Sequence, residues 1–452
     1  MANKFLVVLG CWLIQFLEVG TIKSFAVLLG HIVRDLESTT GRLGMYIGLY
    51  HAVTIMSGIV VKALLNRYSP RSLSMLGGLI GSLGLMICSE VTKPIYFAVC
   101  LFISGLGFSM AVLPSMVSVM YAFGDKYMLP FSVGLMGGGM GMMILPLLTQ
   151  KLLEAYTWQG ALLILGAINL HVVVSGALFE KAILQKESPP YQSDLQETPQ
   201  TRDASYEQDS STSDLHRVGN GDRVQHHASQ SDSWLFRCSR RTVELFRAAR
   251  QGAGMGVFSE YPIIMYALLA AYLHGVSYIG WTVFVISNAE AKGFDESIAV
   301  FLSLVAGIGN IIGRLMPGLL NYLNKDMFPS RNSFILFGII GALPLCLNGI
   351  ASRFSTLCVF ATLNGLALGA KTIVKNTTVV DVVPPSLSST VLPFAMICSG
   401  LGEITGGWMT GRIFDLTGSM DTSFLFLGCV DIFSVVVLLL SLLHGKIHHL
   451  RS

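Results

Sequence analysis

Charged residues are scarce in this chain. They make up 13% of its 452 residues, against 52% hydrophobic residues, and the mean hydropathy is +0.62. This composition is too apolar for a soluble protein. The net charge is only +3, and the lysines and arginines are scattered between apolar runs. Because no basic patch is present, nucleic acid is not an expected partner, and we expect a lipid bilayer and a small solute instead.

Cysteine, histidine and glycine lack the patterns of catalytic or cofactor sites. Of the eight cysteines only Cys238 lies in a polar stretch, and no spacing is typical of a disulfide framework or a zinc site. His51, His171 and His274 stand on separate apolar runs, which disfavours a membrane enzyme. The glycine clusters lie inside apolar runs and follow no strand, which excludes a dinucleotide-binding loop. The sequence therefore predicts no enzyme, no cofactor and no metal.

Only one long stretch is polar. Residues 184–258 separate two halves, each with six apolar segments. These segments have about 20 residues or more, which is enough to cross a hydrocarbon core of about 30 Å at about 1.5 Å per residue. Six spans on each side of a polar loop are the plan of a secondary transporter. We predict an all-α membrane protein with twelve transmembrane helices in two pseudo-symmetric six-helix bundles.

The predicted spans define three regions of the chain. They are 5–30, 43–64, 71–89, 95–122, 129–153, 159–180, 261–288, 297–322, 331–351, 354–380, 386–413 and 422–445. This gives a first bundle (1–183), a cytoplasmic linker (184–258) and a second bundle with a short tail (259–452). The first run follows Lys4 directly and is interpreted as a retained span rather than a cleavable signal. The even number of spans and the basic central loop place both termini in the cytoplasm.

The linker allows two interpretations. Residues 188–233 are polar and are expected to be disordered. In 235–250, arginines alternate with hydrophobic residues, which fits either a short basic amphipathic helix on the inner leaflet or a plain solvated linker.

The two halves contain similar segments in the same order. Leu64-Leu65-Asn66 after the second span resembles Leu319-Leu320-Asn321 after the eighth, and Gly105-Leu106-Gly107 in the fourth resembles Gly365-Leu366-Ala367 in the tenth. The offset of about 255–260 residues favours parallel repeats with a substrate site between them at mid-membrane. Chance likeness among helices rich in glycine and leucine is the alternative.

Ionisable residues inside the predicted spans are rare, because each costs at least about 2.5–3.5 kcal/mol unless it faces a partner or a water-filled path. We identify six of them: Glu18, Lys23, Arg314, Lys371, Lys375 and Glu403. Among the deep ones, three bases (Lys23, Arg314 and Lys371) oppose two acids. This excess favours an anion or a zwitterion as the solute.

Several of these residues have a structural alternative. Arg314 either lines the substrate path or is a structural arginine satisfied by carbonyls, and Lys23 either lines the path or snorkels to the outer face. Lys375 is interpreted as the partner of Asp381 near the inner end of its span. Glu403 lies mid-span and is expected to pair with one of the bases.

Several motifs resemble the monocarboxylate transporter family of the major facilitator superfamily. They are Lys23-Ser24-Phe25 in the first span, Leu65-Asn66-Arg67-Tyr68 after the second, Trp158 with Gly160 and Ile164-Leu165-Gly166 in the sixth, and Gly411-Arg412-Ile413-Phe414-Asp415 with Gly418-Ser419 after the eleventh. The resemblance covers both halves. It implies twelve helices, alternating access, the plasma membrane and small carboxylate-like substrates, with Lys23 and Arg314 as the substrate-site bases. It also suggests a single-span ancillary glycoprotein as a partner, as for some relatives.

One departure from the family pattern concerns proton coupling. Proton-coupled members carry an aspartate four residues before the arginine of the eighth span, and here that position is Asn310, which has no protonation equilibrium near neutral pH. The chain therefore resembles a divergent member, and Glu18 or Glu403 remains as a substitute proton carrier. The candidate substrate-binding residues are Lys23, Arg314, Asn310, Glu403, Lys371 and Glu18.

We predict a secondary transporter that moves a small monocarboxylate-like anion or zwitterion across the plasma membrane by alternating access. The alternative is a proton-independent facilitative carrier of an amino-acid-like or other non-lactate solute. A channel or receptor is disfavoured because neither needs paired repeats with buried bases in both halves.

Overall fold

The computed structural model describes residues 4–124, 128–179, 257–323, 328–384 and 387–449, and these residues form helices and no strand. The helices before residue 180 are α1 (Lys4–Asp35), α2 (Thr40–Met56), α3 (Gly58–Leu65), α4 (Pro70–Cys88), α5 (Pro94–Phe123), α6 (Met128–Ala155), α7 (Trp158–Asn169) and α8 (His171–Ala177). Those after residue 256 are α10 (Val257–Glu260), α11 (Ile264–Ala291), α12 (Glu296–Ala299), α13 (Phe301–Leu323), α14 (Ser330–Cys346), η3 (Asn348–Ile350), α15 (Phe354–Val380), α16 (Ser388–Thr417) and α17 (Met420–His449). The interpretations of 188–233 and 235–250 lie outside the described residues.

The twelve predicted spans are confirmed. Ten helical segments in the described part of the chain are long and apolar enough to cross a membrane. The other two are α14, with 17 residues, and α16, whose 30 residues include Glu403, Arg412 and Asp415. Three spans consist of two helices each, since the chain breaks at Ser57, Leu170 and Val300.

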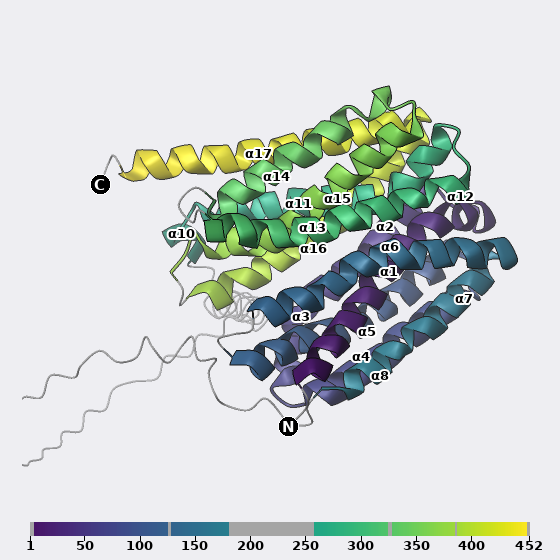
Figure 1. Cartoon of the computed structure of the whole chain (residues 1–452), viewed down its shortest axis with the longest axis horizontal. Helices are drawn as coiled ribbons and strands as arrows, with labels where there is room; N and C mark the ends of the chain where they lie inside the picture. Colours follow the sequence, from purple (N-terminus) through teal and green to yellow (C-terminus); the bar gives the residue numbers. More distant parts are fainter. Residues whose placement is uncertain (1–3, 125–127, 180–256, 324–327, 385–386, 450–452) are drawn as a thin grey trace, which may run out of the picture. The chain divides into compact units, whose positions relative to one another are not determined.

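The two halves form two six-helix bundles with the same internal contacts. In the first half α1 packs on α6, and α2 packs on α5; in the second half α11 packs on α16, and α13 packs on α15. Figure 1 shows the first half in purple to blue and the second in green to yellow. Each contact in one half thus joins the same pair of spans, counted from the start of the half, as in the other.

Glycines bring these helices close together in both halves. On α6, Gly137 and Gly141 lie against the backbone of α1, and on α16, Gly402 and Gly406 lie against the backbone of α11. A Cβ atom at any of these four positions would overlap a carbonyl oxygen of the neighbouring helix; these oxygens belong to Trp12, Phe16, Tyr272 and Val276. Small residues are what allow such an approach in lipid, and their matching places support the predicted parallel repeats.

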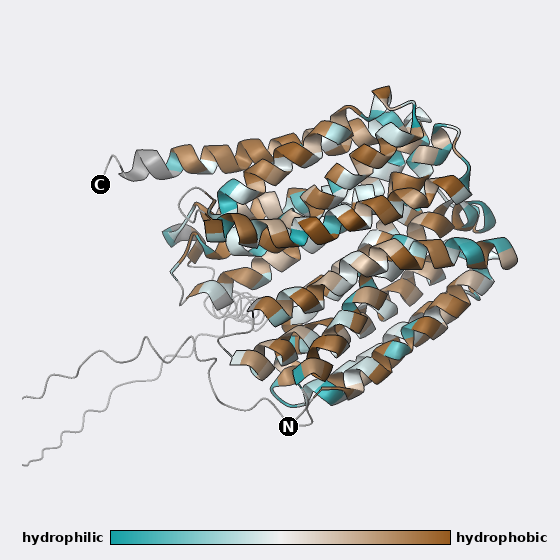
Figure 2. Ribbon diagram, viewed as in Figure 1, coloured by the Kyte–Doolittle hydropathy of each residue, from teal (hydrophilic) through white to brown (hydrophobic). Residues whose placement is uncertain are grey.

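The outward surface of the bundles is apolar. On α4, Leu76 is 50% exposed and Leu83 is 43% exposed, whereas Gly77, Gly81 and Gly84 are buried against neighbouring helices. Figure 2 shows hydrophobic residues along the outer faces of the helices. A soluble protein buries its leucines instead, so this arrangement is that of helices surrounded by lipid.

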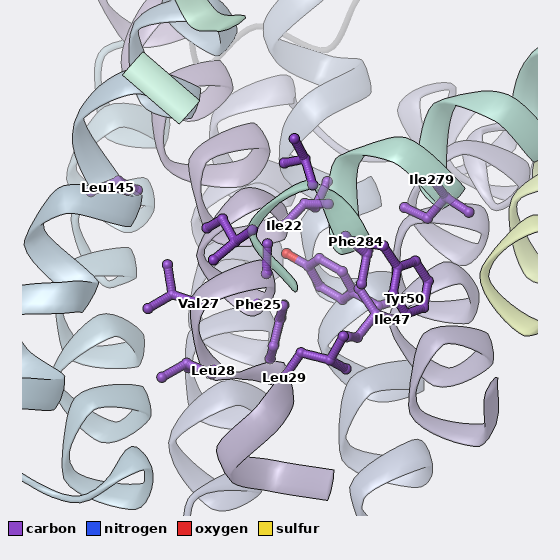
Figure 3. Close-up of a cluster of buried hydrophobic side chains, with 14 of the residues drawn as sticks. Ile22, Phe25, Val27, Leu28, Leu29, Ile47, Tyr50, Leu145, Ile279 and Phe284 are labelled. Carbon is purple, nitrogen blue, oxygen red and sulfur yellow. The ribbon is translucent and has the colours of Figure 1, made fainter. Parts of the chain in front are cut away.

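The core is centred on α1, which is buried along most of its length. Phe25 contacts Tyr50 of α2 and Phe97 of α5 edge to face, with ring centroids 6.1 and 6.3 Å apart. Figure 3 shows Phe25 and Tyr50 together with Phe284 of α11, a helix of the second half. The apolar core therefore continues across the boundary between the halves.

A series of glycines joins α2 to α16 across that boundary. We call Gly41, Gly44 and Gly48 of α2 with Gly407 and Gly411 of α16 the glycine seam, because each faces the backbone of the other helix. At the end of the seam, Asp415 accepts hydrogen bonds from the backbone N–H groups of Thr40, at 3.1 Å, and Gly41, at 2.9 Å. The first turn of α2 is thus capped by a carboxylate of the other half.

Candidate functional site

Arg314 lies where α13 of the second half contacts α6 of the first. Its Nε donates to Oδ1 of Asn310 at 2.8 Å, and its Nη1 donates to the carbonyl oxygen of Leu135 in α6 at 3.2 Å. Asn310 is itself buried, and its Nδ2 donates to the carbonyl oxygen of Gly365 at 3.4 Å. Within the described part of the chain, no carboxylate forms an ion pair with Arg314 and its Nη2 makes no hydrogen bond. Neutral groups from both halves therefore orient this guanidinium, and its charge has no direct counter-ion.

His51 of α2 lies between two buried glutamates. Its Nδ1 is 2.7 Å from Oε2 of Glu403 in α16, and its Nε2 is 3.8 Å from Oε1 of Glu18 in α1. The expectation that Glu403 pairs with a lysine or arginine is wrong. The glycine seam is the reason, since the carbonyl of Glu403 lies against Gly48 and His51 follows one turn later on α2.

Tyr278 of α11 packs against His51. The two rings are stacked with centroids 5.3 Å apart, and the ring of His274 lies 5.9 Å from Tyr278 on its own helix. Glu18 also interacts electrostatically with Arg314, which connects the histidine to the arginine. We call the charged and titratable residues gathered here the central cluster: Glu18, His51, Arg314, Lys375 and Glu403.

Lys375 of α15 belongs to this cluster. Its Nζ donates to the hydroxyl oxygen of Ser399 in α16 at 2.8 Å, and it interacts electrostatically with Glu403 and His51. The interpretation that Lys375 pairs with Asp381 is wrong, because its buried side chain is directed toward α16 rather than along α15.

Lys371 has a counter-ion that sequence analysis missed. Its Nζ contacts both carboxylate oxygens of Asp431 in α17 at 2.8 Å, and the two side chains are 0% and 1% exposed. Asp431 lies in the middle of the most apolar span, where we had not counted an ionisable residue. The charge of Lys371 is therefore neutralised inside the second half.

Lys23 joins the halves nearer the α1–α2 turn. It is completely buried, its Nζ donates to the carbonyl oxygen of Thr282 in α11 at 2.8 Å, and it lies 4.4 Å from the centre of the Trp281 ring. The alternative that Lys23 snorkels to the membrane surface is wrong, because a cation–π contact and a carbonyl hold it inside the protein.

The charges of the central cluster balance. Arg314 and Lys375 oppose Glu18 and Glu403, and His51 decides whether the sum is zero or positive. The two carboxylates approach different nitrogens of one ring, so they do not converge on a single ion. In agreement with this geometry, no group of three or more His, Cys, Asp or Glu side chains in the described ranges is arranged to hold a metal ion.

The sequence pattern drew attention to Arg314, whereas His51 was interpreted as isolated. Its partner Glu403 is 352 residues away, and no local pattern reports such a contact. The spacing of Gly41, Gly44 and Gly48 was the available signal, since small residues one turn apart indicate that a second helix approaches that face of α2.

Comparisons with known proteins agree with this architecture. The family model described as "Major Facilitator Superfamily" matches residues 11–325. Monocarboxylate transporter 13 of Rattus norvegicus is 24% identical over 425 residues, which cover 94% of this chain and 85% of that protein. Monocarboxylate transporter 12 of Homo sapiens is 24% identical over 440 residues, covering 96% of this chain and 79% of that protein. The predicted resemblance to a divergent monocarboxylate transporter is confirmed.

Solved structures share the fold at lower identity. The nucleoside transporter NupG has a TM-score of 0.65 at 14% identity, over 98% of this chain and 99% of that one. A bacterial homolog of the human lysosomal transporter Spinster, inward-facing and unoccupied, has a TM-score of 0.60 at 14% identity, over 97% of this chain and 95% of that one. These likenesses show that the fold is shared with solved transporter structures.

Proposed function

Because this chain belongs to the Major Facilitator Superfamily, we propose that it is a secondary transporter that moves a small monocarboxylate-like anion or zwitterion across the plasma membrane. The proposal includes alternating access between two membrane halves, 1–183 and 259–452, joined by a cytoplasmic linker at 184–258. The names of its relatives support a carboxylate as the solute, and members of this superfamily are transporters rather than enzymes.

The observation that carries the proposal is the unpaired guanidinium of Arg314 at the contact between the halves. A guanidinium stays charged and offers a planar pair of donors that matches the two oxygens of a carboxylate. Asn310 and the carbonyl of Leu135 occupy Nε and Nη1 in this state, and Nη2 has no partner in the described chain. A solute carboxylate would take Nη2 and displace one of the two neutral acceptors.

The other bases have separate roles in this proposal. Lys375 adds a second positive charge to the central cluster, and the hydroxyl of Ser399 is an exchangeable partner for its ammonium group. Lys23 lies on the solute path between the central cluster and the α1–α2 turn, where it donates a hydrogen bond to the carbonyl oxygen of Thr282. Lys371 holds α15 to α17 through its ion pair and does not touch the solute.

The described state would be closed toward the outside. We propose that both termini are cytoplasmic, which places the α1–α2 turn on the outer side. The glycine seam, the cap by Asp415 and the buried Lys23 all join the halves on that side. Alternating access requires these contacts to separate when the solute enters from outside.

The alternative function is a proton-independent carrier of an amino-acid-like solute. One observation favours it: Oε1 of Glu18 is buried without a hydrogen-bond partner and Glu18 interacts with Arg314. A zwitterion would place its carboxylate at Arg314 and its ammonium group at Glu18.

A transport assay tests both the proposed function and its alternative. Vesicles with the purified full chain receive labelled keto acids or the matching amino acids, and uptake is measured. The pairs are pyruvate with alanine, ketoisocaproate with leucine, and phenylpyruvate with phenylalanine. A carrier shows saturable uptake that is accelerated by unlabelled solute on the other side. Arg314→Lys is expected to keep the fold but lose about tenfold to hundredfold in solute affinity, because a charged bidentate contact contributes roughly 1.5–3 kcal/mol.

Arg314→Ala is expected to abolish that uptake. The proposal fails if no carboxylate solute saturates the wild-type protein. It also loses its basis if Arg314→Lys transports normally at matched amounts in the membrane, since Arg314 would then be a structural arginine. Arg353→Lys, at the beginning of α15 and far along the chain from the cluster, is the matched control.

A further inference from the structure

The two nitrogens of His51 face two carboxylates. One carboxylate is hydrogen-bonded to the ring, and the other has a buried oxygen without a hydrogen-bond partner. A neutral imidazole carries one proton, and the 2.7 Å distance from Nδ1 to Oε2 of Glu403 fits a ring that donates there. The lone pair of Nε2 then faces Oε1 of Glu18 at 3.8 Å. That oxygen is buried and has no hydrogen-bond partner. The structure thus contains an acceptor for one more proton on Nε2, after a movement of less than about 1 Å.

From this arrangement we infer that His51 is the proton-binding site of the transporter, and that its proton binds together with a monocarboxylate. The inference rests on the proposed function. With His51 neutral, Arg314 and Lys375 balance Glu18 and Glu403, and an added anion leaves the cluster negative. A proton on Nε2 makes the cluster positive by one charge, and one monocarboxylate restores neutrality. In a poorly hydrated site, each of the two ions therefore strengthens the binding of the other.

The groups around His51 are consistent with a charge held at this place. Glu18 faces it from α1, Glu403 from α16, and Tyr278 from α11. Two further titratable groups lie nearby, His274 on α11 and Lys375 on α15, and of these Lys375 opposes a positive charge on the ring. Helix α5 contacts α2 through Gly105 and Phe108, which carry no charge. Two carboxylates in direct reach outweigh one lysine that does not touch the ring.

The position of Glu403 links this proton to the movement of the halves. His51 and Glu18 belong to the first half, whereas Glu403 belongs to the second. Separation of α2 from α16 along the glycine seam removes Glu403 from Nδ1 and leaves Glu18 as the nearest carboxylate. A protonated His51 ring, with one N–H toward each carboxylate, therefore stabilises the state in which the seam is closed. By reciprocity, closure of the seam strengthens proton binding.

His51 provides the titratable group that is missing at position 310, where the residue is Asn310. The carboxamide at position 310 orients Arg314 but cannot exchange a proton, so the anion-binding residue and the proton-binding residue are different groups on different halves. The proton arrives as a free ion from water and leaves to water, and Nε2 alternates between a lone pair and an N–H bond. No other reactant is needed.

A proton-flux experiment tests this inference. Vesicles containing the purified full chain and an internal pH indicator receive the keto acids and amino acids named above. For the wild type we expect internal acidification with the keto acid and none with the uncharged amino acid. Keto-acid uptake should rise toward roughly tenfold per unit of external acidification, the limit for one coupled proton.

His51→Gln keeps a hydrogen-bonding side chain at the seam but does not titrate. We expect it to exchange labelled keto acid at a reduced rate, with no acidification and a flat pH profile. Glu18→Gln keeps the shape but removes the acceptor charge, and it leaves the cluster positive by one with His51 neutral. The pH profile of uptake should therefore shift to more acidic values and become shallower. His171→Gln, on the exposed face of α8, and His274→Gln serve as matched histidine controls and should keep both signals.

The outcomes separate the two proposals. Acidification that persists in His51→Gln, or disappears in His274→Gln instead, overturns the proton site while carboxylate transport by the wild type stands. Uptake of the keto acid without any pH dependence in the wild type also overturns it. Failure of the wild type to move either member of any pair contradicts the proposed function itself. If His51→Gln does not fold, the pH profile of keto-acid uptake by Glu18→Gln tests the inference instead. A profile unchanged from the wild type refutes the proton site at His51.

Discussion

Lys371 and Lys375 lie one turn apart on α15, yet they meet opposite surroundings. Lys371 contacts both oxygens of Asp431 at 2.8 Å, whereas Lys375 has the hydroxyl of Ser399 at 2.8 Å and no carboxylate in contact within the described chain. The first pair joins two helices of one half. The second lysine faces the contact between the halves. A buried charge with its counter-ion stabilises the fold, whereas one without a counter-ion retains a cost that a bound anion removes.

The largest effect is expected for Lys371→Met, which tests whether Lys371 has a structural role that Lys375 lacks. It leaves the carboxylate of Asp431 buried and unpaired, which is expected to cost about 3–5 kcal/mol of stability. We expect a large fall in the unfolding temperature of the detergent-purified protein and in the amount that reaches the membrane. The double variant Lys371→Met with Asp431→Leu replaces both charges by apolar groups and should recover most of the stability. A single variant as stable as the wild type would contradict a structural role for the pair.

Lys375→Met, the same substitution one turn later, should leave the fold intact. It removes a charge that has only a hydroxyl partner, so the unfolding temperature should change little. Anion affinity should fall roughly tenfold, or about 1.4 kcal/mol, because one of the two positive charges of the central cluster is lost. The concentration dependence of keto-acid uptake measures this effect. Destabilisation equal to that of Lys371→Met would remove the distinction between the two lysines.

Ser399→Ala should give the smallest effect and sharpen the comparison further. It removes one hydrogen bond from Lys375 and is expected to cost about 0.5–1.5 kcal/mol of stability. The charge of Lys375 remains, so anion affinity should be retained. Thermal unfolding and uptake, measured on the same preparation with Ser388→Ala at the start of α16 as a control, test both statements. A loss of affinity as large as that of Lys375→Met would mean that the hydroxyl, not the ammonium group, binds the solute.

The membrane architecture was readable from the sequence because it depends on local composition. Each span is a continuous apolar run, and a single polar stretch separates the halves. The breaks at Ser57, Leu170 and Val300 were not predicted, since the apolar run continues through them and hydropathy does not report how the backbone bends. Asp431 was missed for the same reason, because one carboxylate hardly changes the mean hydropathy of its span.

The partners of the ionisable residues were less accessible. Depth in the membrane identified Glu18, Arg314 and Glu403 as residues that need an explanation. Depth does not say which of the other helices each one faces, and contacts such as His51 with Glu403 depend on the register between two spans of different halves. That register is set by glycine contacts along whole helices rather than by any neighbour in sequence.

The glycine seam has a consequence for the kinetics of this protein. Most helix contacts interlock through side chains, which must change rotamer before the helices part. Along α2 and α16, backbone meets backbone at Gly44, Gly48 and Gly407, so at these positions no side chain has to change rotamer before the helices separate. An added methyl group at any of these positions would act as a wedge. It would prop the two helices apart without weakening either bundle, and the carrier would remain folded while resting in the wrong half of its cycle.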